Sequence, residues 1–158
     1  MKLVVIDSDL IPIGKGGFAE AFRQKSTGRV LKKLMPEVAL DVRNRHRFKR
    51  EYEIMKDLAE VPGVLRVFDF DESNCSYTME AGETTLLEFM NNPLSEQVKM
   101  SIIEQIVGTM AAIHSRGYIH RDLSPTNIFL LGGQLKIADF GLGKNLNALS
   151  SYQTTDTN

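Results

Sequence analysis

The stretch that decides the fold reads YIHRDLSPTN at residues 118–127, and the tetrapeptide ADFG follows it at residues 138–141. Between these two segments, Gly132-Gly133 separates two short apolar runs. Two glycines between apolar runs are a strong signal for a tight β-hairpin, because the favoured two-residue turns need positive φ angles. The sequence therefore predicts a hairpin with strands at 128–131 and 134–138 and polar segments at its open end.

Three polar side chains are expected at that open end. Counting outward from the turn places Asn127 opposite Ala138, and directly opposed residues have Cα atoms about 4.5–5.5 Å apart. The side chains of Asn127 and Asp139 therefore start near each other, and Asp122 lies on the same loop. One anionic and one neutral oxygen ligand suit Mg²⁺, which keeps its other positions for waters and phosphates. Each residue alone would also fit a turn or a cap, but together they predict a metal and phosphate site.

The segment GKGGFA at residues 14–19 lies between two expected strands. Glycines let the backbone fold close over a ligand and aim amide N–H groups at phosphate. Taken alone, such a segment is more often an ordinary hairpin turn. A phosphate-binding role for this segment therefore depends on whether other polar groups of the chain lie beside it.

A lysine and a glutamate are expected to form an inward-facing pair. In the strand at 29–34, side chains alternate between faces, so Lys32 shares its face with two apolar residues. In the helix at 43–60, Glu51 falls inside the apolar stripe, whereas its charged neighbours lie outside it. A buried carboxylate is unfavourable unless a cation meets it. Lys32 is the obvious cation, and the alternative is that Glu51 lies at the rim of the stripe and reaches water.

Composition excludes several classes of protein. The chain has 158 residues, the length of one ordinary domain, with 42% hydrophobic and 25% charged residues. Nineteen Lys and Arg residues face twenty Asp and Glu residues, which excludes a disordered chain and a dedicated nucleic-acid-binding protein. No apolar run approaches the roughly eighteen residues of a membrane span, and Asp7 follows too soon for a signal peptide. Cys75 is the single cysteine, so an internal disulfide is excluded and a cytoplasmic location is expected.

Strands dominate the first half of the chain, and helices follow. Strands are expected at residues 9–14, 18–23, 29–34, 64–70 and 76–80, in addition to the two of the hairpin. Helices are expected at 43–60 and at 95–116, the second with Ser95 as its N-cap and Gly117 as its stop. Residues 145–158 are mostly small and polar and are expected to be loop. This order of elements predicts an α+β fold.

Together these motifs resemble the eukaryotic-type (Hanks-type) protein kinases. The matching segments are the Gly-rich loop with Gly14, Gly16 and Ala19, the strand motif Val30-Leu31-Lys32, the helix segment at 47–51, His120-Arg121-Asp122 with Asn127, and Asp139-Phe140-Gly141. Ala19 stands where the family usually has a third glycine. The resemblance extends from Ile13 to about Lys144. It implies a protein-kinase-like α+β fold, with a small antiparallel β-sheet lobe carrying one helix and then the beginning of a helical lobe.

The resemblance implies a catalytic set of five residues. Lys32 would contact the α- and β-phosphates of ATP while Glu51 holds it. Asp122 would orient the acceptor hydroxyl and take its proton, and Asn127 and Asp139 would hold Mg²⁺ or Mn²⁺. The resemblance also implies an internal apolar column, which would be built from Met55, Val67, His120 and Phe140.

A nucleotide pocket is implied as well. The family usually places Val on the second strand and Ala on the third, both against adenine, and here those positions read Ala21 and Val30. Met79 would lie behind adenine, and Phe129 stands below it where Leu is common. A strand register shifted by one residue is the alternative to this swap. The set expected to contact ATP is Ile13, Gly14, Lys15, Gly16, Gly17, Phe18, Ala19, Ala21, Val30, Lys32, Met79, Glu80, Gly82 and Phe129.

In domain terms, residues 1–158 would be one incomplete kinase domain. Residues 1–80 would form the amino-terminal lobe, and residues 81–158 the hinge and part of the carboxy-terminal lobe. The chain ends inside what resembles the activation segment, before an Ala-Pro-Glu motif and the substrate-binding helices, so a truncated gene or a fragment is expected. Large apolar residues cover about half the circumference of the helix at 95–116. Left uncovered, they would favour self-association.

The function implied is ATP-dependent phosphoryl transfer to a protein hydroxyl, with Ser or Thr favoured over Tyr. The expected partners are a nucleotide and a protein substrate, with no nucleic acid and no membrane. Ser124 weakens the Ser/Thr assignment, because Ser/Thr-specific members often carry Lys at that place. Two alternatives stay open: a truncated, non-catalytic kinase fold that binds nucleotide or a partner protein, and a small-molecule kinase that shares the Asp-x-x-x-x-Asn spacing.

Overall fold

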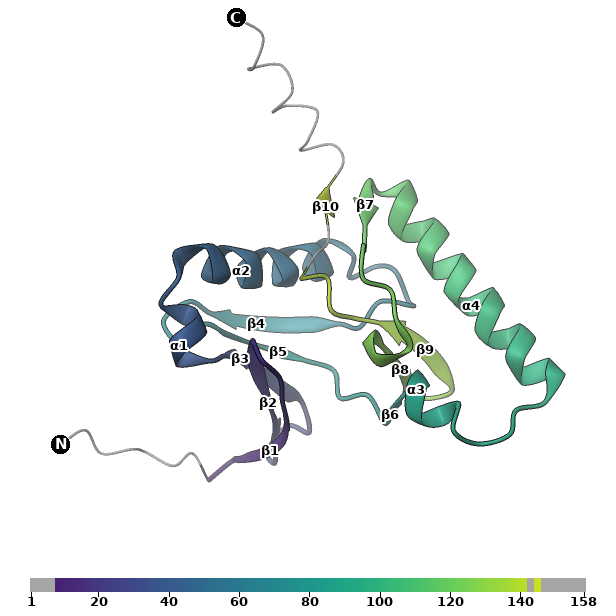
Figure 1. The fold of residues 1–158 in the computed structure, drawn as a ribbon, viewed down its shortest axis with the longest axis horizontal. Coiled ribbons are helices and arrows are strands. Elements are labelled where there is room, and N and C mark those ends of the chain that lie inside the picture. Colours follow the sequence, from purple (N-terminus) through teal and green to yellow (C-terminus); the bar gives the residue numbers. More distant parts are fainter. Residues whose placement is uncertain (1–7, 142–143, 146–158) are drawn as a thin grey trace, which may run out of the picture.

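Five antiparallel strands form the first part of the fold. The computed structural model describes residues 8–141 and 144–145. The strands lie in the order β1-β2-β3-β5-β4. Their bounds are Leu10–Lys15 for β1, Ala19–Gln24 for β2, Val30–Leu34 for β3, Val67–Asp71 for β4 and Ser76–Met79 for β5. Helix α2 (Val42–Asp57) packs against this sheet beside β4, and the short helix α1 (Pro36–Ala39) precedes it (Figure 1).

The sequence of helix α2 explains both where the helix begins and which of its faces packs on the sheet. The side chain of Asp41 accepts a hydrogen bond from the backbone N–H of Arg43 at 2.9 Å, which caps the first turn. The face toward the sheet buries Phe48, Met55 and, among these apolar side chains, Glu51. The apolar stripe read from the sequence is therefore the buried face, and Glu51 lies within it.

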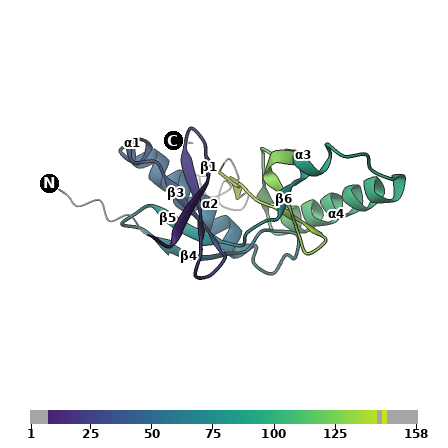
Figure 2. The ribbon, with the colours of Figure 1, turned by 90° about the horizontal axis from the view of Figure 1, so that it is seen from below.

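Two helices and two small sheets form the second part of the fold. The two α-helices are α3 (Leu86–Phe89) and α4 (Glu96–Ser115), and a short 3-10 helix, η1 (Pro125–Asn127), follows them. One sheet joins β6 (Thr84–Thr85), β8 (Ile128–Leu131) and β9 (Gln134–Ile137), and the other pairs β7 (Tyr118–Ile119) with β10 (Lys144–Asn145). Figure 2 shows α3 and α4 at the opposite end of the long axis from β1 to β5, with the chain between β5 and β6 connecting the two parts.

The predicted hairpin and long helix are confirmed. In the β8–β9 pair, Leu131 lies opposite Gln134, and the N–H of Ala138 donates to the carbonyl of Asn127 at 2.9 Å. The side-chain oxygen of Ser95 accepts from the N–H of Val98 at 3.2 Å and caps α4. The α+β class is also confirmed.

Several boundaries differ from the predictions. Helix α2 ends at Asp57 rather than at residue 60, and β4 begins at Val67 rather than at residue 64. Val64 instead forms an isolated parallel bridge with Ile137, so it joins the two parts of the fold. Asn145, predicted as loop, belongs to β10, while residues 146–158 lie outside the described residues. The elements α1, α3, β6, β7 and β10 were not expected, because two to four residues are too short to show a periodic pattern.

The outward face of α4 carries apolar side chains. Met100, Ile103 and Val107 are 53%, 53% and 61% exposed, whereas Ile113 near the end of the helix is fully buried. Their spacing of three and four residues places the three exposed side chains on one stripe. This stripe is the part of the broad apolar surface of α4 that no described element covers.

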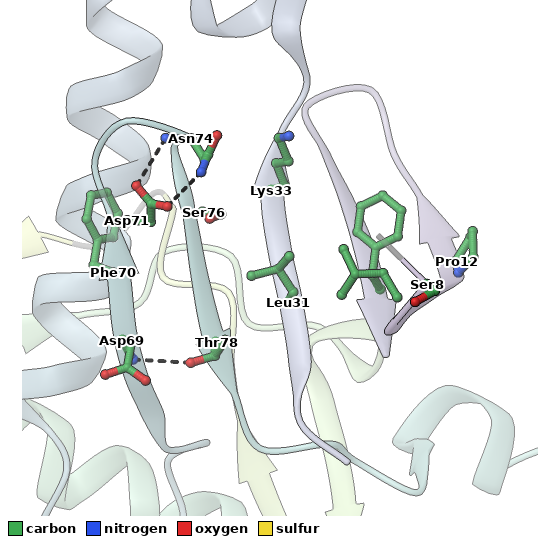
Figure 3. A pocket seen from close by; sticks show the side chains of 12 residues that line it. Ser8, Pro12, Leu31, Lys33, Asp69, Phe70, Asp71, Asn74, Ser76 and Thr78 are labelled. Carbon is green, nitrogen blue, oxygen red and sulfur yellow. Dashed lines mark hydrogen bonds between the residues drawn. The ribbon is translucent and has the colours of Figure 1, made fainter. Parts of the chain in front are cut away.

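The outer face of the five-stranded sheet is hollowed. A cavity of about 880 Å³ lies over it, and Leu31 and Lys33 of β3 line this cavity (Figure 3). Because successive side chains of a strand point to opposite faces, Lys33 faces this hollow and Lys32 faces the inner side of the sheet. Two adjacent lysines thus have different surroundings.

Candidate active site

The separated motifs of the sequence meet at two adjoining cavities of about 210 Å³ and 380 Å³. The residues that line both cavities are Gly16, Ala19, Lys32 and Asp139. The smaller cavity is also lined by Gly14, Glu20, Ala21, Tyr77, Met79, Asn127, Phe129 and Ala138, and the larger by Gly17, Phe18, Arg47, Glu51, Asp122 and Gly141. Residues from the glycine loop, β3, α2, the 118–127 loop and the 138–141 segment therefore surround one continuous site.

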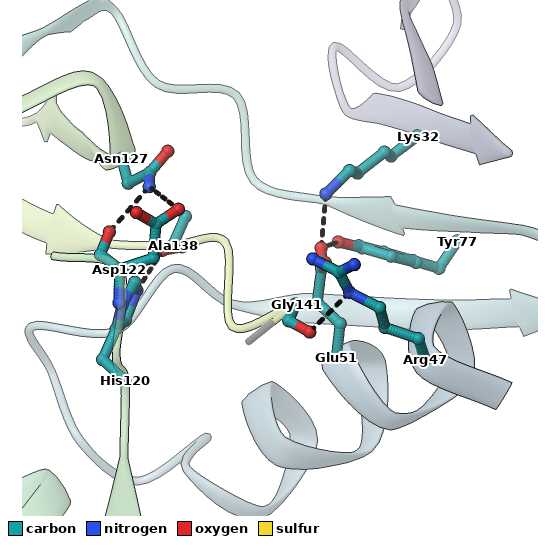
Figure 4. A network of polar contacts seen from close by, with 9 residues as sticks. All are labelled: Lys32, Arg47, Glu51, Tyr77, His120, Asp122, Asn127, Ala138 and Gly141. Atoms are coloured by element: carbon teal, nitrogen blue, oxygen red, sulfur yellow. Dashed lines mark hydrogen bonds and ion pairs between the residues drawn. The ribbon is translucent and has the colours of Figure 1, made fainter. Parts of the chain in front are cut away.

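The predicted Lys32–Glu51 ion pair is present, and a third residue joins it (Figure 4). Oε1 of Glu51 accepts hydrogen bonds from Nζ of Lys32 and from the hydroxyl of Tyr77. Glu51 is only 2% exposed, so the alternative that it reaches water at a rim is wrong. We call Lys32, Glu51 and Tyr77 the closed cluster.

Tyr77 is the member of the closed cluster that sequence reasoning missed. It lies directly opposite Lys32 in the β3–β5 pairing, with 1% of its surface exposed. Burial and, secondarily, the adjacent Glu51 carboxylate raise the pKa of Tyr77 well above the usual tyrosine value. The phenol therefore remains protonated and serves as a hydrogen-bond donor. Only the strand order β3-β5, which single-sequence patterns do not give, would have pointed to it.

His120 connects the 118–127 loop to the 138–141 segment. Its Nδ1 accepts from the backbone N–H of Asp122 at 3.2 Å, so the ring proton lies on Nε2, which donates to the carbonyl of Ala138 at 2.7 Å. The ring is fully buried and packs on Phe140 with centroids 4.5 Å apart. The other two members of the expected apolar column, Met55 and Val67, are also buried.

Asp122 and Asn127 lie on the far side of the site from Lys32 (Figure 4). Together with Asp139, which lines both cavities alongside Lys32, we call them the open cluster. Nδ2 of Asn127 donates to the carbonyl of Asp122 at 3.0 Å and to its Oδ2 at 3.4 Å (Figure 4). The amide oxygen of Asn127 therefore faces away from Asp122. Within residues 8–141, the side chain of Asp139 accepts no hydrogen bond and forms no ion pair. The open cluster thus offers an amide oxygen and a carboxylate to a ligand.

Backbone strain coincides with the open cluster. Arg121, directly before Asp122, has φ 72°, and Asp139 has φ 59°. Residues other than glycine rarely adopt these angles, which cost about 1–3 kcal/mol each and persist where the surrounding structure fixes them. The described part of the chain has three such residues: Asp139 lines the larger cavity, Arg121 directly precedes Asp122, which also lines it, and the third is Cys75. Such clustering is typical of functional sites.

Arg47 links α2 to the 138–141 segment. Its Nε donates to the carbonyl of Gly141 at 2.9 Å, and its guanidinium lies 5.3 Å from the ring centroid of Phe18 at the tip of the glycine loop. A Cβ on Gly141 would lie 3.0 Å from Oε2 of Glu51, so a larger residue would press against the ion pair. Glycine therefore permits close approach of this segment to α2.

The adenine end of the site is partly as expected. Ala21, Met79 and Phe129 line the smaller cavity, whereas Val30 is buried opposite Met79 and does not line it. Neither Ala21 nor Val30 points to solvent, which argues against a shifted register. A Cβ on Gly82 would lie 2.6 Å from Cδ1 of Phe129, so this hinge position must be glycine while Phe129 stands below it.

Five residues expected to contact ATP do not line either cavity: Val30 and Gly82, described above, and Ile13, Lys15 and Glu80. Ile13 is 49% exposed, and Lys15 forms an ion pair with Glu20 at 3.2 Å. The side chain of Glu80 accepts from the N–H of Arg66 at 2.9 Å, and its own N–H donates to the carbonyl of that residue at 2.9 Å. The side chain of Glu80 therefore contacts Arg66, directly before β4, and Lys136 at 3.7 Å rather than the two cavities.

Comparison with known proteins identifies the family. The model of the protein kinase domain matches residues 8–157, nearly the whole chain. The chain therefore belongs to the protein kinase family, as its motifs indicated.

Curated relatives agree with this assignment. The chain is 33% identical over 147 residues to serine/threonine-protein kinase pkn2 of Myxococcus xanthus, covering 85% of this chain and 18% of that protein. It is 33% identical over 156 residues to serine/threonine-protein kinase PrkC of Bacillus subtilis, covering 92% and 24%. It is 30% identical over 144 residues to the probable serine/threonine-protein kinase YbdM of Bacillus subtilis, covering 85% and 56%. The chain thus spans between 18% and 56% of these relatives.

Two further properties of the described residues concern membranes and metals. No helix among them is both long enough and apolar enough to cross a membrane. No three or more His, Cys, Asp or Glu side chains gather there as a metal site. The candidate metal ligands are the carboxylate of Asp139 and the amide oxygen of Asn127, which line the smaller cavity, and this pair suits Mg²⁺ better than zinc.

Proposed function

We propose that this chain carries the nucleotide-binding and catalytic residues of a protein kinase that transfers the γ-phosphoryl group of Mg·ATP to a Ser or Thr hydroxyl of a protein. The observation that carries the proposal is the meeting of Lys32, Asp122 and Asp139 at one pair of cavities beneath the glycine loop. Serine and threonine are favoured because all three relatives above are named serine/threonine-protein kinases.

Each end of the site would have its own task. Lys32, oriented by Glu51, would bind phosphate oxygens, and the backbone of the glycine loop would cover them. Asp122 is exposed at the edge of the larger cavity, where it could orient an incoming hydroxyl and accept its proton. Phosphoryl transfer needs mainly positioning and electrostatic stabilisation, which these fixed side chains supply.

The open cluster fits a divalent metal. Asn127 points its amide oxygen away from Asp122, and the carboxylate of Asp139 has acceptor capacity left, so these two residues would hold Mg²⁺ or Mn²⁺. The metal would supply neutralisation of the negative charge on the phosphates. The protein would supply two oxygen ligands and leave the other positions to phosphates and water.

The domain organisation and the partners belong to the same proposal. Residues 1–80 would form the amino-terminal lobe, and residues 81–158 the hinge and part of the next lobe, with Met79 and the backbone of Glu80 and Gly82 at the adenine. A protein substrate is the expected partner, in a cytoplasmic location.

The exposed stripe of Met100, Ile103 and Val107 would favour self-association, and Val107→Lys should reduce light scattering by the chain. Unchanged scattering would contradict that role.

Calorimetry with Mg·ATP on the chain tests the proposal. The unchanged chain should bind, and Lys32→Met should weaken binding by about tenfold or more, because it removes a charged partner of the phosphates. Lys33→Met is the matched control, because Lys33 faces the outer hollow, and it should bind as the unchanged chain does. Absent binding by the unchanged chain, or equal binding by the Lys32→Met chain, would overturn the proposal. Transfer itself is tested with labelled ATP and a generic protein substrate on the longest expressed protein that contains this chain.

A further inference from the structure

Tyr77 occupies a place that the proposed function does not use. Its hydroxyl donates to the same carboxylate oxygen of Glu51 that accepts from Lys32 (Figure 4). We propose that Tyr77 is a positioning residue that holds the Glu51 carboxylate in place, and through it Lys32, for contact with nucleotide phosphates. The proposal rests on the function proposed above and assigns to that site a further residue.

The surroundings of Tyr77 fix its hydroxyl. The β3–β5 pairing sets it opposite Lys32, and its ring packs on Phe48 and Tyr52 with centroids 5.1 Å and 5.7 Å apart. With 1% of its surface exposed, the ring has no room for another rotamer. The hydroxyl is therefore a fixed donor on the sheet, whereas Glu51 extends toward it from α2.

Glu51 needs a second donor because of its burial. A carboxylate that is 2% exposed must have its charge satisfied by partners within the protein. When the ammonium group of Lys32 also binds phosphate oxygens, it is shared between two anions. Tyr77 then keeps the carboxylate bonded at the same point, so the position of Lys32 does not depend on one contact alone.

A phenol suits this task better than a cation would. It donates a hydrogen bond without adding charge, so it does not repel the Lys32 ammonium nearby. Because burial raises its pKa, the phenol stays protonated across the physiological range. The closed cluster therefore gains a donor while its net charge stays neutral.

The alternative role of Tyr77 is packing alone, and the chain offers a matched control. Tyr77→Phe keeps the ring and its aromatic contacts and removes the hydroxyl. Tyr52→Phe removes a buried hydroxyl from the same aromatic group, but that hydroxyl donates to the carbonyl of Phe68 at 2.8 Å. Both variants lose one hydrogen bond of a tyrosine hydroxyl, and only the first loses a bond to Glu51.

Calorimetry with Mg·ADP and with adenosine separates the two roles, because adenosine lacks the phosphates that Lys32 would bind. In Tyr77→Phe, the affinity for Mg·ADP relative to that for adenosine should fall about tenfold, the effect of removing one hydrogen bond to a charged group. In Tyr52→Phe this ratio should stay unchanged, although its melting temperature falls. An unchanged ratio in Tyr77→Phe, or an equal fall in both variants, would overturn the proposal.

The same substitution in the Lys32→Met variant tests whether the Tyr77 hydroxyl acts through Lys32. With Lys32→Met in place, adding Tyr77→Phe should lower the ratio no further, because the hydroxyl acts through Lys32. A further loss would overturn the positioning role. Failure of the unchanged chain to bind either ligand would instead refute the proposed function, and with it this inference; binding of both ligands with no effect of Tyr77→Phe refutes the inference alone.

Discussion

The two ends of the cleft are built in opposite ways. In the closed cluster, Lys32, Glu51 and Tyr77 satisfy one another, and the carboxylate is sealed from water. In the open cluster, Asp122 is exposed and Asp139 is half-buried, with no hydrogen bond to its side chain from any described residue. The first end is held together by its own contacts, whereas the second presents acceptors to something outside the chain.

The backbone differs in the same way. Lys32 and Tyr77 lie on paired strands and Glu51 on a capped helix, so regular hydrogen bonding fixes them. Asp122 follows a strained residue in a loop, and Asp139 is itself strained. Rigid elements thus position the cation proposed to bind phosphate, and a strained segment positions the acceptors, where binding energy from the proposed metal and nucleotide would offset the strain. Substitutions at the two ends should therefore affect the protein in different ways.

The largest effect is expected in the open cluster. Asp122→Asn removes a proton acceptor and should lower the rate of phosphoryl transfer by about 10²–10⁴-fold while sparing Mg·ATP binding. Asp139→Asn removes a metal ligand and should weaken Mg·ATP binding itself. Calorimetry on both variants of the chain, with transfer assays on the longest expressed protein that contains this chain, measures the two effects separately.

Asp69→Asn is the control for these two variants. Asp69 is an exposed carboxylate on β4, next to Arg29 at 3.7 Å, and its loss should alter neither quantity. Equal losses of Mg·ATP binding in Asp122→Asn and Asp139→Asn would contradict the division of tasks between them.

The sequence alone predicted those features that a short segment of the chain encodes by itself. The glycine turn fixed the hairpin register, so the meeting of Asn127 and Asp139 at one cavity was predictable. The apolar stripe of α2 pointed to Glu51, and alternation along β3 pointed to Lys32. Tyr77 was not predictable, because its contact requires that the neighbour of β3 in the sheet is β5 and not β4, the next strand along the chain.

Contacts between distant loops also escaped prediction. The bond from Arg47 to Gly141 joins residues 94 positions apart, and no local pattern distinguishes Arg47 from the other basic residues of α2. Val30 was expected to line the nucleotide pocket and is instead buried beside it, because strand alternation gives the face of a side chain but not its depth.

The next largest effect concerns the stability of the closed cluster. Lys32→Met leaves the buried Glu51 carboxylate with Tyr77 alone, so the free energy of unfolding should fall by about 1–3 kcal/mol. Adding Glu51→Met should recover part of this loss, because an apolar pair can replace a buried ion pair without penalty. Urea unfolding measures both.

An exposed ion pair supplies the reference for that prediction. Lys49 and Glu72 lie 3.3 Å apart at the surface, and Lys49→Met should change stability by no more than about 0.5 kcal/mol. A double variant less stable than Lys32→Met would show that the pair stabilises the fold beyond neutralising its own charges.

A smaller effect should appear at alkaline pH. The folded pKa of Tyr77 is raised above the unfolded value of 10.0, so its contribution to stability is complete below pH 10 and is lost as pH rises further. By about pH 11 the loss should reach about 1 kcal/mol, and Tyr77→Phe should lack this component. Urea midpoints of both chains between pH 9 and pH 11 measure the difference, and parallel curves would contradict it.

The smallest effect is expected where the two ends are joined. Arg47 is exposed, so Arg47→Ala should lower the unfolding free energy by at most about 1 kcal/mol. Because Gly141 lies two residues from Asp139, losing this bond frees the segment that positions the metal ligand. Mg·ADP affinity should therefore fall by about two- to threefold, half a kcal/mol or so. Arg50→Ala, at an exposed site on the same helix, is the control and should leave affinity unchanged. If Arg47→Ala behaves like Arg50→Ala, the open cluster keeps its geometry without help from α2, and the two ends of the cleft are independent.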